Sequence, residues 1–124
     1  MRVKKIEIEI TDKQKIYNEF KTMATAVMRG KKIKPKEVVS FANIEIFRQF
    51  FTENRLNLLK IIKKEKPDSI YALSKLVDRD FKNVHSDLQI LKDFGLVDLT
   101  KTKKNKKNVK PSLLYSGLNL HFVF

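Results

Sequence analysis

RDFKNVHSDLQILKDFGLV, residues 79–97, carries the clearest amphipathic pattern in the 124-residue sequence. Its apolar residues recur at spacings of three and four, so they fall within a narrow arc on one side of a helix. The residues of that arc are Phe81, Val84, Leu88 and Leu91. The pattern predicts a helix between Asp80 and Phe94 whose apolar side faces a core.

Both ends of this helix are also indicated by the sequence. Asp80 is predicted to be the N-cap, because a carboxylate in that position can accept a hydrogen bond from a free amide of the first turn. Gly95 can adopt the left-handed conformation after the last turn. The Leu96 amide would then donate to the Leu91 carbonyl, and the two leucine side chains would touch, as in a Schellman motif.

Two further helices are predicted upstream. The first begins after Thr52, a favourable N-cap residue, has a wide apolar face and ends before Pro67. The second begins after Asp68 or Ser69 and runs for only about two turns. Its inward-facing residues are predicted to be Ile70, Leu73, Leu76 and Val77.

A β-hairpin is predicted downstream. Residues 97–100, VDLT, predict a strand, and residues 101–108, KTKKNKKN, predict a lysine-rich turn. Residues 109–124 predict a second strand, a turn at Ser116 and Gly117, and a last strand. Three helices followed by a hairpin are the order of a winged helix-turn-helix. The sequence therefore predicts an α+β fold, with a winged-helix DNA-binding domain over residues 52–124.

Residues 1–51 are predicted to form an N-terminal strand-helix extension that dimerises or binds a partner. Isoleucines alternate with glutamates within residues 3–10, which is the period of a half-buried strand. Thr11 and Gln14 form a capping box that predicts the start of a helix. Residues 37–51 are interpreted as a short strand followed by a short helix. The apolar side of the long helix is predicted to carry Ile16, Phe20, Met23 and Val27.

The composition points to a polyanionic partner. Lys and Arg number 27 against 14 Asp and Glu, which gives a net charge of +13. This charge flanks residues 67–98 and is dense in residues 101–110, which hold six lysines and no acid. Cysteine and long apolar runs are absent, so we expect a cytoplasmic protein without disulfides or a membrane span. A lysine excess that serves only solubility is the alternative interpretation.

The polar side of the predicted 79–97 helix is suited to DNA. With the apolar arc turned inward, a row of polar residues remains on the front, and His85 lies at its margin. The row consists of Lys82, Asn83, Ser86 and Gln89. Such side chains can reach base edges or phosphates when a helix lies in a major groove. A solvated helix face is the alternative, but the short preceding helix and the basic hairpin favour DNA.

The hairpin is predicted to hold the DNA backbone. Because Asp87 and Asp93 offset Lys82 and Lys92, the reading helix is neutral and attraction must come from its flanks. Hairpin lysines are candidates for phosphate contacts, although a solvated loop would have the same composition. The flanking candidates are Ser69, Lys101, Lys103, Lys104, Lys106 and Lys107.

Residues 52–98 resemble the helix-turn-helix core of ArsR- and MarR-type winged-helix transcriptional regulators, in which a Leu-x-x-Leu-x-x-x-Gly-Leu-Val ending is common. More narrowly, residues 79–97 are similar to small prokaryotic regulators with an Arg-Asp-aromatic-Lys-Asn-Val-His-x-Asp signature. Some members of that group look like antitoxins encoded beside a small toxin. By position, the resemblance implies that DNA is contacted by Lys82, Asn83, His85 and Ser86.

Signatures of catalysis and of metal binding are missing from the sequence. There is no Gly-x-Ser-x-Gly motif and no phosphate loop, since the three glycines are isolated from one another. His85 and His121 are far apart, and the Cys and His clusters of metal-sensing ArsR-type proteins have no counterpart. We therefore expect no enzyme activity, no cofactor and no metal.

The predicted function is that of a transcriptional regulator, acting as a repressor, that binds specific double-stranded DNA. One winged-helix module covers a modest area of DNA, so we expect a homodimer on a pseudo-palindromic site. One alternative is an antitoxin that binds a small toxin and regulates its own operon. Another is an RNA-binding module, which the lysine excess alone would suggest.

Overall fold

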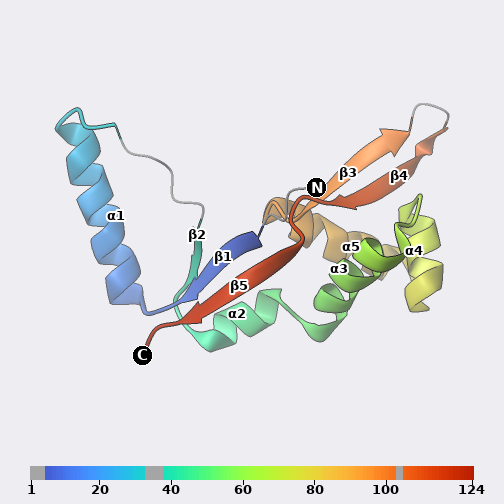
Figure 1. Cartoon of the computed structure of the whole chain (residues 1–124), viewed down its shortest axis with the longest axis horizontal. Helices are drawn as coiled ribbons and strands as arrows, with labels where there is room; N and C mark the ends of the chain where they lie inside the picture. The colour runs from blue at the N-terminus through green and yellow to red at the C-terminus, as the bar shows by residue number, and fades with distance from the viewer. Residues whose placement is uncertain (1–4, 33–37, 103–104) are drawn as a thin grey trace. The chain divides into compact units, whose positions relative to one another are not determined.

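The computed structural model describes residues 5–32, 38–102 and 105–124, without the side chains of residues 102–108. The described residues form five helices and five strands, so the fold is of the predicted α+β class (Figure 1). They group into two compact units. We call Phe50–Ser116 the helical unit, and Lys5–Gln49 together with Gly117–Phe124 the sheet unit.

The helical unit has the element order expected of a winged helix. Three helices follow one another, α3 (Glu53–Glu65), α4 (Ile70–Val77) and α5 (Phe81–Asp93). They are followed by two antiparallel strands, β3 (Val97–Thr102) and β4 (Asn105–Leu113). The three helices pack on one another, and the hairpin packs against them.

An apolar core joins these elements, and it contains most of the residues that periodicity placed there. Its buried side chains come from all three helices, from the segment just before α3 and from both sides of the hairpin. They are Phe51, Leu58, Ile62, Ile70, Leu73, Val84, Leu88, Leu91, Leu96, Val97 and Pro111. Two predicted inward residues are wrong, since Leu76 and Phe81 are exposed.

Helix ends in this unit follow local sequence signals. Thr52 caps α3 and accepts a hydrogen bond from the Arg55 amide. Gly95 has a φ of +78°, and the Leu96 amide donates to the Leu91 carbonyl at 3.0 Å, which confirms the predicted Schellman contact. Asp80 is the N-cap residue of α5, as predicted, although its side chain makes no capping hydrogen bond.

The sheet unit is built on three parallel strands in the order β2-β1-β5. Its strands are β1 (Lys5–Ile10), β2 (Val38–Phe41) and β5 (Gly117–Phe122). Helix α1 (Lys13–Met28) lies between β1 and β2 in the chain, and α2 (Ile44–Phe50) follows β2. The predicted N-terminal strand and long helix, and the short strand and helix after them, are therefore confirmed where the structure describes them.

The last strand belongs to the sheet unit, which differs from the predicted domain of residues 52–124. β5 pairs with β1 in register, so Ile6, Ile8 and Ile10 align with Leu118, Leu120 and Phe122. Paired residues of neighbouring strands point to the same side of a sheet. The apolar positions of β5 thus extend the apolar face of β1, which gives the pairing a physical reason.

The start of α1 differs by one residue from the prediction. Asp12, not Thr11, is the N-cap, and its carboxylate accepts a hydrogen bond from the Lys15 amide at 2.8 Å. The Thr11 amide instead donates to the Phe41 carbonyl of β2. The Lys15 ammonium reaches back to the Glu9 carboxylate at 3.0 Å, and this hydrogen bond raises the pKa of Lys15.

Candidate nucleic-acid interface

The polar row predicted from the sequence lies on the solvent side of α5. Val84, Leu88 and Leu91 are fully buried beneath the helix. On the other side the side chains are exposed, apart from that of Gln89, which is half-buried. The exposed candidates are Lys82, Asn83, His85 and Ser86. The helix therefore presents donors and acceptors outward from a backbone that is anchored by its core side.

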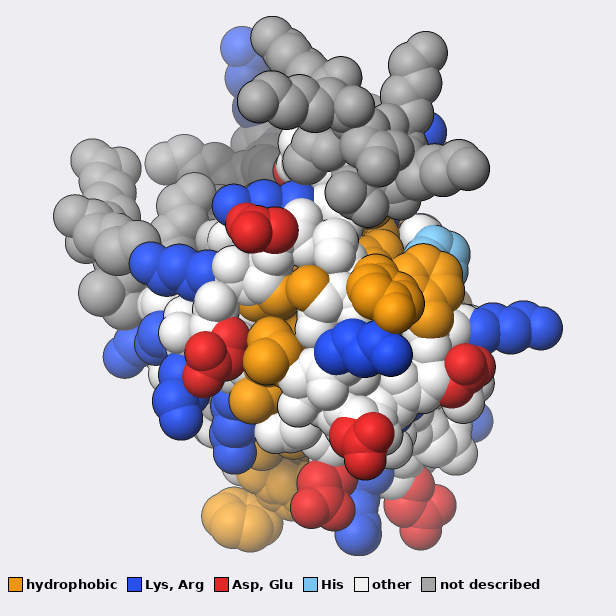
Figure 2. Space-filling model, turned by 90° about the vertical axis from the view of Figure 1, so that its right-hand side faces the viewer, with side chains coloured by type: hydrophobic (Ala, Val, Ile, Leu, Met, Phe, Trp, Pro, Cys, Tyr) orange, Lys and Arg blue, Asp and Glu red, His pale blue; other side chains and the backbone are white. Residues whose placement is uncertain are grey.

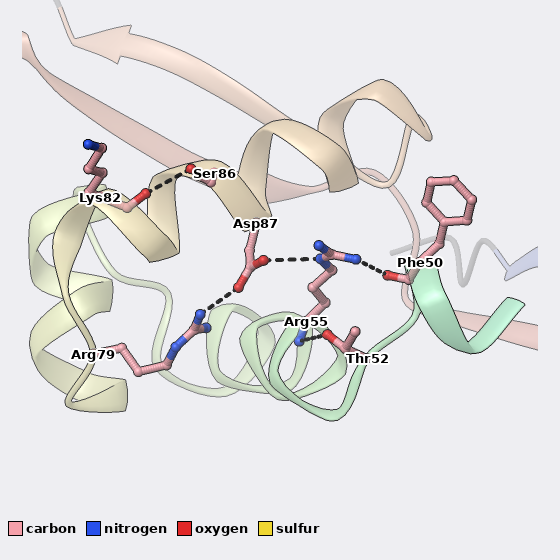
Figure 3. A network of polar contacts seen from close by, with 7 residues as sticks. All are labelled: Phe50, Thr52, Arg55, Arg79, Lys82, Ser86 and Asp87. Atoms are coloured by element: carbon pink, nitrogen blue, oxygen red, sulfur yellow. Dashed lines mark hydrogen bonds and ion pairs between the residues drawn. The ribbon is translucent and has the colours of Figure 1, made fainter. Parts of the chain in front are cut away.

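A carboxylate on α5 fixes the helix to its neighbours. Asp87 accepts from Arg55 Nε of α3 at 3.0 Å through one oxygen, and from Arg79 Nη2 at 2.7 Å through the other (Figure 3). Only 14% of the Asp87 side chain is exposed. Because Arg79 lies in the turn between α4 and α5, one carboxylate ties together α3, this turn and α5.

The arginine on α3 extends this network toward the N-terminal end of the unit. Arg55 Nη1 donates to the Phe50 carbonyl at 2.8 Å, and the Arg55 amide donates to the Thr52 hydroxyl (Figure 3). Charge-assisted hydrogen bonds of this kind have narrow geometry, so they limit how far α5 can rotate about its own axis. The rotation of α5 determines which side chains point outward.

The same network changes the electrostatic description of α5. The sequence counts Asp87 as a negative charge that offsets the lysines of the reading helix. In the structure its charge is met by two guanidinium groups, and its side chain lies away from the polar row. The negative charge of Asp87 therefore does not offset the positive charge of Lys82 on the outward side of α5.

Two serines among the candidates also have local structural roles. The Ser86 hydroxyl donates to the Lys82 carbonyl one turn earlier at 3.0 Å (Figure 3). The Ser69 hydroxyl caps α4 by accepting from the Ala72 amide at 3.0 Å. A hydroxyl has one donor and two acceptor lone pairs, so each serine keeps hydrogen-bonding capacity for a ligand.

A hollow of about 280 Å³ brings three of the candidates together. It lies where the first turns of α4 and α5 meet strand β4, and Figure 2 shows hydrophobic side chains gathered beside a histidine on this side of the protein. Its lining residues are Ser69, Ile70, Tyr71, Phe81, Lys82, His85 and Val109. Ser69, Lys82 and His85 thus converge on one surface, although they come from two helices.

Two aromatic residues of this hollow were missed as candidates. The Tyr71 side chain is 57% exposed, and the Lys75 ammonium lies 5.1 Å from its ring centre. Phe81 is 44% exposed and stacks on His85, with ring centres 6.0 Å apart. Phe81 is the first residue of α5 and lies at the margin of its apolar arc, so no preceding turn covers it. A helical projection of residues 81–93 shows this marginal position of Phe81, so its exposure could have been expected from the sequence.

The hairpin lysines are described only in part. Lys101 lies in β3 and is exposed. Lys106 and Lys107 lie in β4, but their side chains are outside the description. Lys103 and Lys104 lie outside the described residues altogether. Their predicted phosphate contacts therefore stay predictions.

The described residues contain neither a cluster of metal ligands nor a helix able to span a membrane. Within residues 5–32, 38–102 and 105–124, no three His, Asp or Glu side chains gather as the ligands of a metal ion would. Over the same ranges, no helix combines the length and the hydropathy that crossing a bilayer requires.

Comparison with known proteins places part of this chain in a family. The family model described as HVO_A0114 matches residues 50–120. No curated protein matches the chain. Among solved structures, a MarR-like transcriptional regulator from Thermotoga maritima is similar, with 20% sequence identity and a TM-score of 0.46. The similarity covers 78% of this chain and 63% of that regulator, so the chain spans less than two thirds of its length.

Proposed function

The chain belongs to the HVO_A0114 family, and from the geometry of the helical unit we propose that it is a transcriptional regulator that binds specific double-stranded DNA. Helix α5 enters the major groove, and its outward side chains contact base edges. The observation that carries this proposal is the exposed polar row on a helix whose opposite side is fully buried and clamped through Asp87. A reading helix needs such a fixed backbone, because base contacts depend on the side chains having one orientation.

The side chains of the row divide into two roles. Asn83 and Ser86 offer donors and acceptors that can pair with base edges. Lys82 offers a charged ammonium group that can donate hydrogen bonds either to a phosphate or to a guanine. Ser69 at the start of α4 and the hairpin lysines contact phosphates and set the position of the protein on the duplex. Attraction to the duplex comes mainly from these flanks, in keeping with the net charge of +13.

The hollow beside Lys82 adds an apolar component to recognition. Tyr71 and Phe81 expose ring surface next to a lysine and a histidine. Thymine carries a methyl group in the major groove, and apolar side chains recognise it by contact. The exposed rings therefore favour a site in which one or more thymines lie under the first turn of α5.

The regulator acts as a repressor and as a homodimer. One helical unit would cover only a few base pairs, and two units on a pseudo-palindrome multiply the discrimination between sites. A bound dimer at a promoter blocks access to it, which requires no further activity from the protein.

Substitution of Asn83 tests whether α5 reads bases. Asn83→Ala should reduce the ratio of affinities for a selected duplex and a scrambled duplex by roughly 5- to 150-fold, the equivalent of about 1–3 kcal/mol. Fluorescence anisotropy with both duplexes measures this ratio. The control is Asn57→Ala, an exposed asparagine on α3 of the same unit, which should leave the ratio unchanged. Equal losses on both duplexes would show that Asn83 does not discriminate between bases.

The antitoxin alternative concerns the sheet unit. The apolar residues of α1 are exposed, which favours a contact between this helix and some protein. A small toxin bound there would make DNA binding a means of autoregulation. Copurification of a toxin-sized protein with the chain expressed from its own operon would support that alternative.

A further inference from the structure

Helix α1 leaves its apolar stripe uncovered. In parallel β-α-β connections the helix normally packs on the sheet and buries its apolar side. Here α1 links the parallel neighbours β1 and β2, yet none of its residues is buried, and Figure 1 shows it beside the sheet rather than across its strands. The Phe20 side chain is 70% exposed. The stripe consists of Ile16, Tyr17, Phe20, Met23, Val27 and Met28.

The sheet of the same unit also leaves part of its apolar face uncovered. On β1 the apolar residues are buried, and on β2 Phe41 is buried and contacts the Phe47 ring of α2 at 5.6 Å between centres. On β5, however, Leu120 and Phe122 point to this same face and remain 48% and 46% exposed. Since β5 is an edge strand, this strip, which we call the β5 strip, lies at the border of the sheet.

The apolar stripe of a helix and the apolar face of a sheet normally cover each other, and the helix stripe and the β5 strip are two such surfaces. A single chain does not bring them together, whereas a second copy offers both missing partners at once. We propose that the chain forms a two-fold dimer in which α1 of each copy lies across the β5 strip of the other. The exchange is reciprocal, so one arrangement covers all four surfaces.

The exposed area is sufficient for a stable dimer. Taking roughly 200 Å² for each large apolar side chain and scaling by its exposed fraction, the helix stripe and the β5 strip together offer roughly 800 Å² per copy. A standard interface buries about 800 Å² per partner. Lys13 is the one charged residue within the arc of the stripe, and it lies at the first turn of the helix, where its long side chain can keep the ammonium group in water while the stripe is buried.

A mass measurement on full-length variants tests the interface. Wild-type protein should sediment at twice the 14.6 kDa chain mass in the absence of DNA. Phe20→Asp and Leu120→Asp should each shift the species to the chain mass at concentrations where wild type is dimeric. The matched controls are Thr22→Asp on the opposite side of α1 and His121→Asp on the opposite side of β5, and both should remain dimeric. Far-UV circular dichroism should show the same helix content in all four variants.

Cross-linking distinguishes the reciprocal exchange from a dimer in which two α1 helices pair. The chain has no cysteine, so Phe20→Cys and Leu120→Cys each introduce a single reactive site. After subunits are mixed and treated with a short bismaleimide, the pair of variants should give a covalent dimer, while Phe20→Cys alone should not. A product from Phe20→Cys alone, or no mixed product from dimeric protein, would overturn the exchange. A wild-type mass of one chain would overturn the dimer itself, and neither result depends on DNA binding.

Discussion

Asp87 joins α5 to α3 and to the turn before α5 through two ion pairs. Its two carboxylate oxygens are shared between arginines that lie 32 residues earlier and 8 residues earlier in the chain. The sequence gives no local sign of this pairing, since only the packing of α3 against α5 brings Arg55 close. Counting charges along the helix therefore treated Asp87 as free, although it is engaged on both sides.

Replacement of this carboxylate should destabilise the protein measurably. Asp87→Asn keeps the shape of the side chain but leaves two largely buried guanidinium groups without a negative partner, which should lower the free energy of unfolding by about 2 kcal/mol. Urea denaturation followed by circular dichroism measures the change. Asp93→Asn, an exposed carboxylate on the same helix, should change it by less than about 0.5 kcal/mol. Equal effects of the two substitutions would contradict the stabilising role of the ion pairs from Asp87 to Arg55 and Arg79.

Phe81 shows how far a periodic pattern can be trusted for one residue. Its spacing from Val84, Leu88 and Leu91 fits the apolar arc, and those three are fully buried while Phe81 is not. A residue in the first turn has no helical turn before it, so its burial depends on what tertiary structure covers that end. The exposed ring became part of the candidate interface instead of the core.

At the scale of elements, signals within a few residues predicted the structure better than signals that need a distant partner. The stop at Gly95 follows from a glycine and two leucines within six positions, and it was predicted down to the hydrogen bond. The strand character of residues 117–122 was equally evident, but its partner was not. Its pairing with β1 joins residues more than 100 positions apart, and a period of two does not specify which strand lies alongside.

The proposed contribution of the hairpin to DNA binding is its positive charge, so removing that charge should alter the salt dependence of binding. Replacing Lys103, Lys104, Lys106 and Lys107 with alanine should weaken binding to every duplex and reduce the slope of log K against log salt by up to about 3.6, or 0.9 for each lost phosphate contact. Titrations at several salt concentrations measure the slope.

The control for this prediction removes the same charge from the sheet unit. Its exposed lysines Lys13, Lys21, Lys31 and Lys32 leave the hairpin intact when they are replaced by alanine. This control should keep most of the wild-type slope, because the proposed phosphate contacts belong to the hairpin and not to the sheet unit. A hairpin variant with an unchanged slope would exclude the hairpin from the interface.

At the scale of the whole molecule, the two units have different proposed roles: the helical unit binds DNA, and the sheet unit forms the dimer. The helical unit has the polar row, the clamp and the hairpin, and the sheet unit has the uncovered apolar surfaces. The sequence indicated the first assignment through the contrast between buried and polar positions of one helix. The sequence indicated the role of the sheet unit only by elimination. Whether an apolar stripe is exposed depends on the tertiary structure and not on the residues of the stripe.

Selection of bound fragments from a random pool of duplex DNA, using purified full-length protein, tests the central claim that α5 reads sequence. The account predicts that one motif is enriched, that it contains thymine, and that it recurs as inverted half-sites about 10 base pairs apart or a multiple of that distance. Structured RNA should compete poorly for the enriched duplex, because its deep major groove does not admit a helix. A pool that stays random after repeated rounds, or RNA that competes as well as the duplex, would contradict the claim.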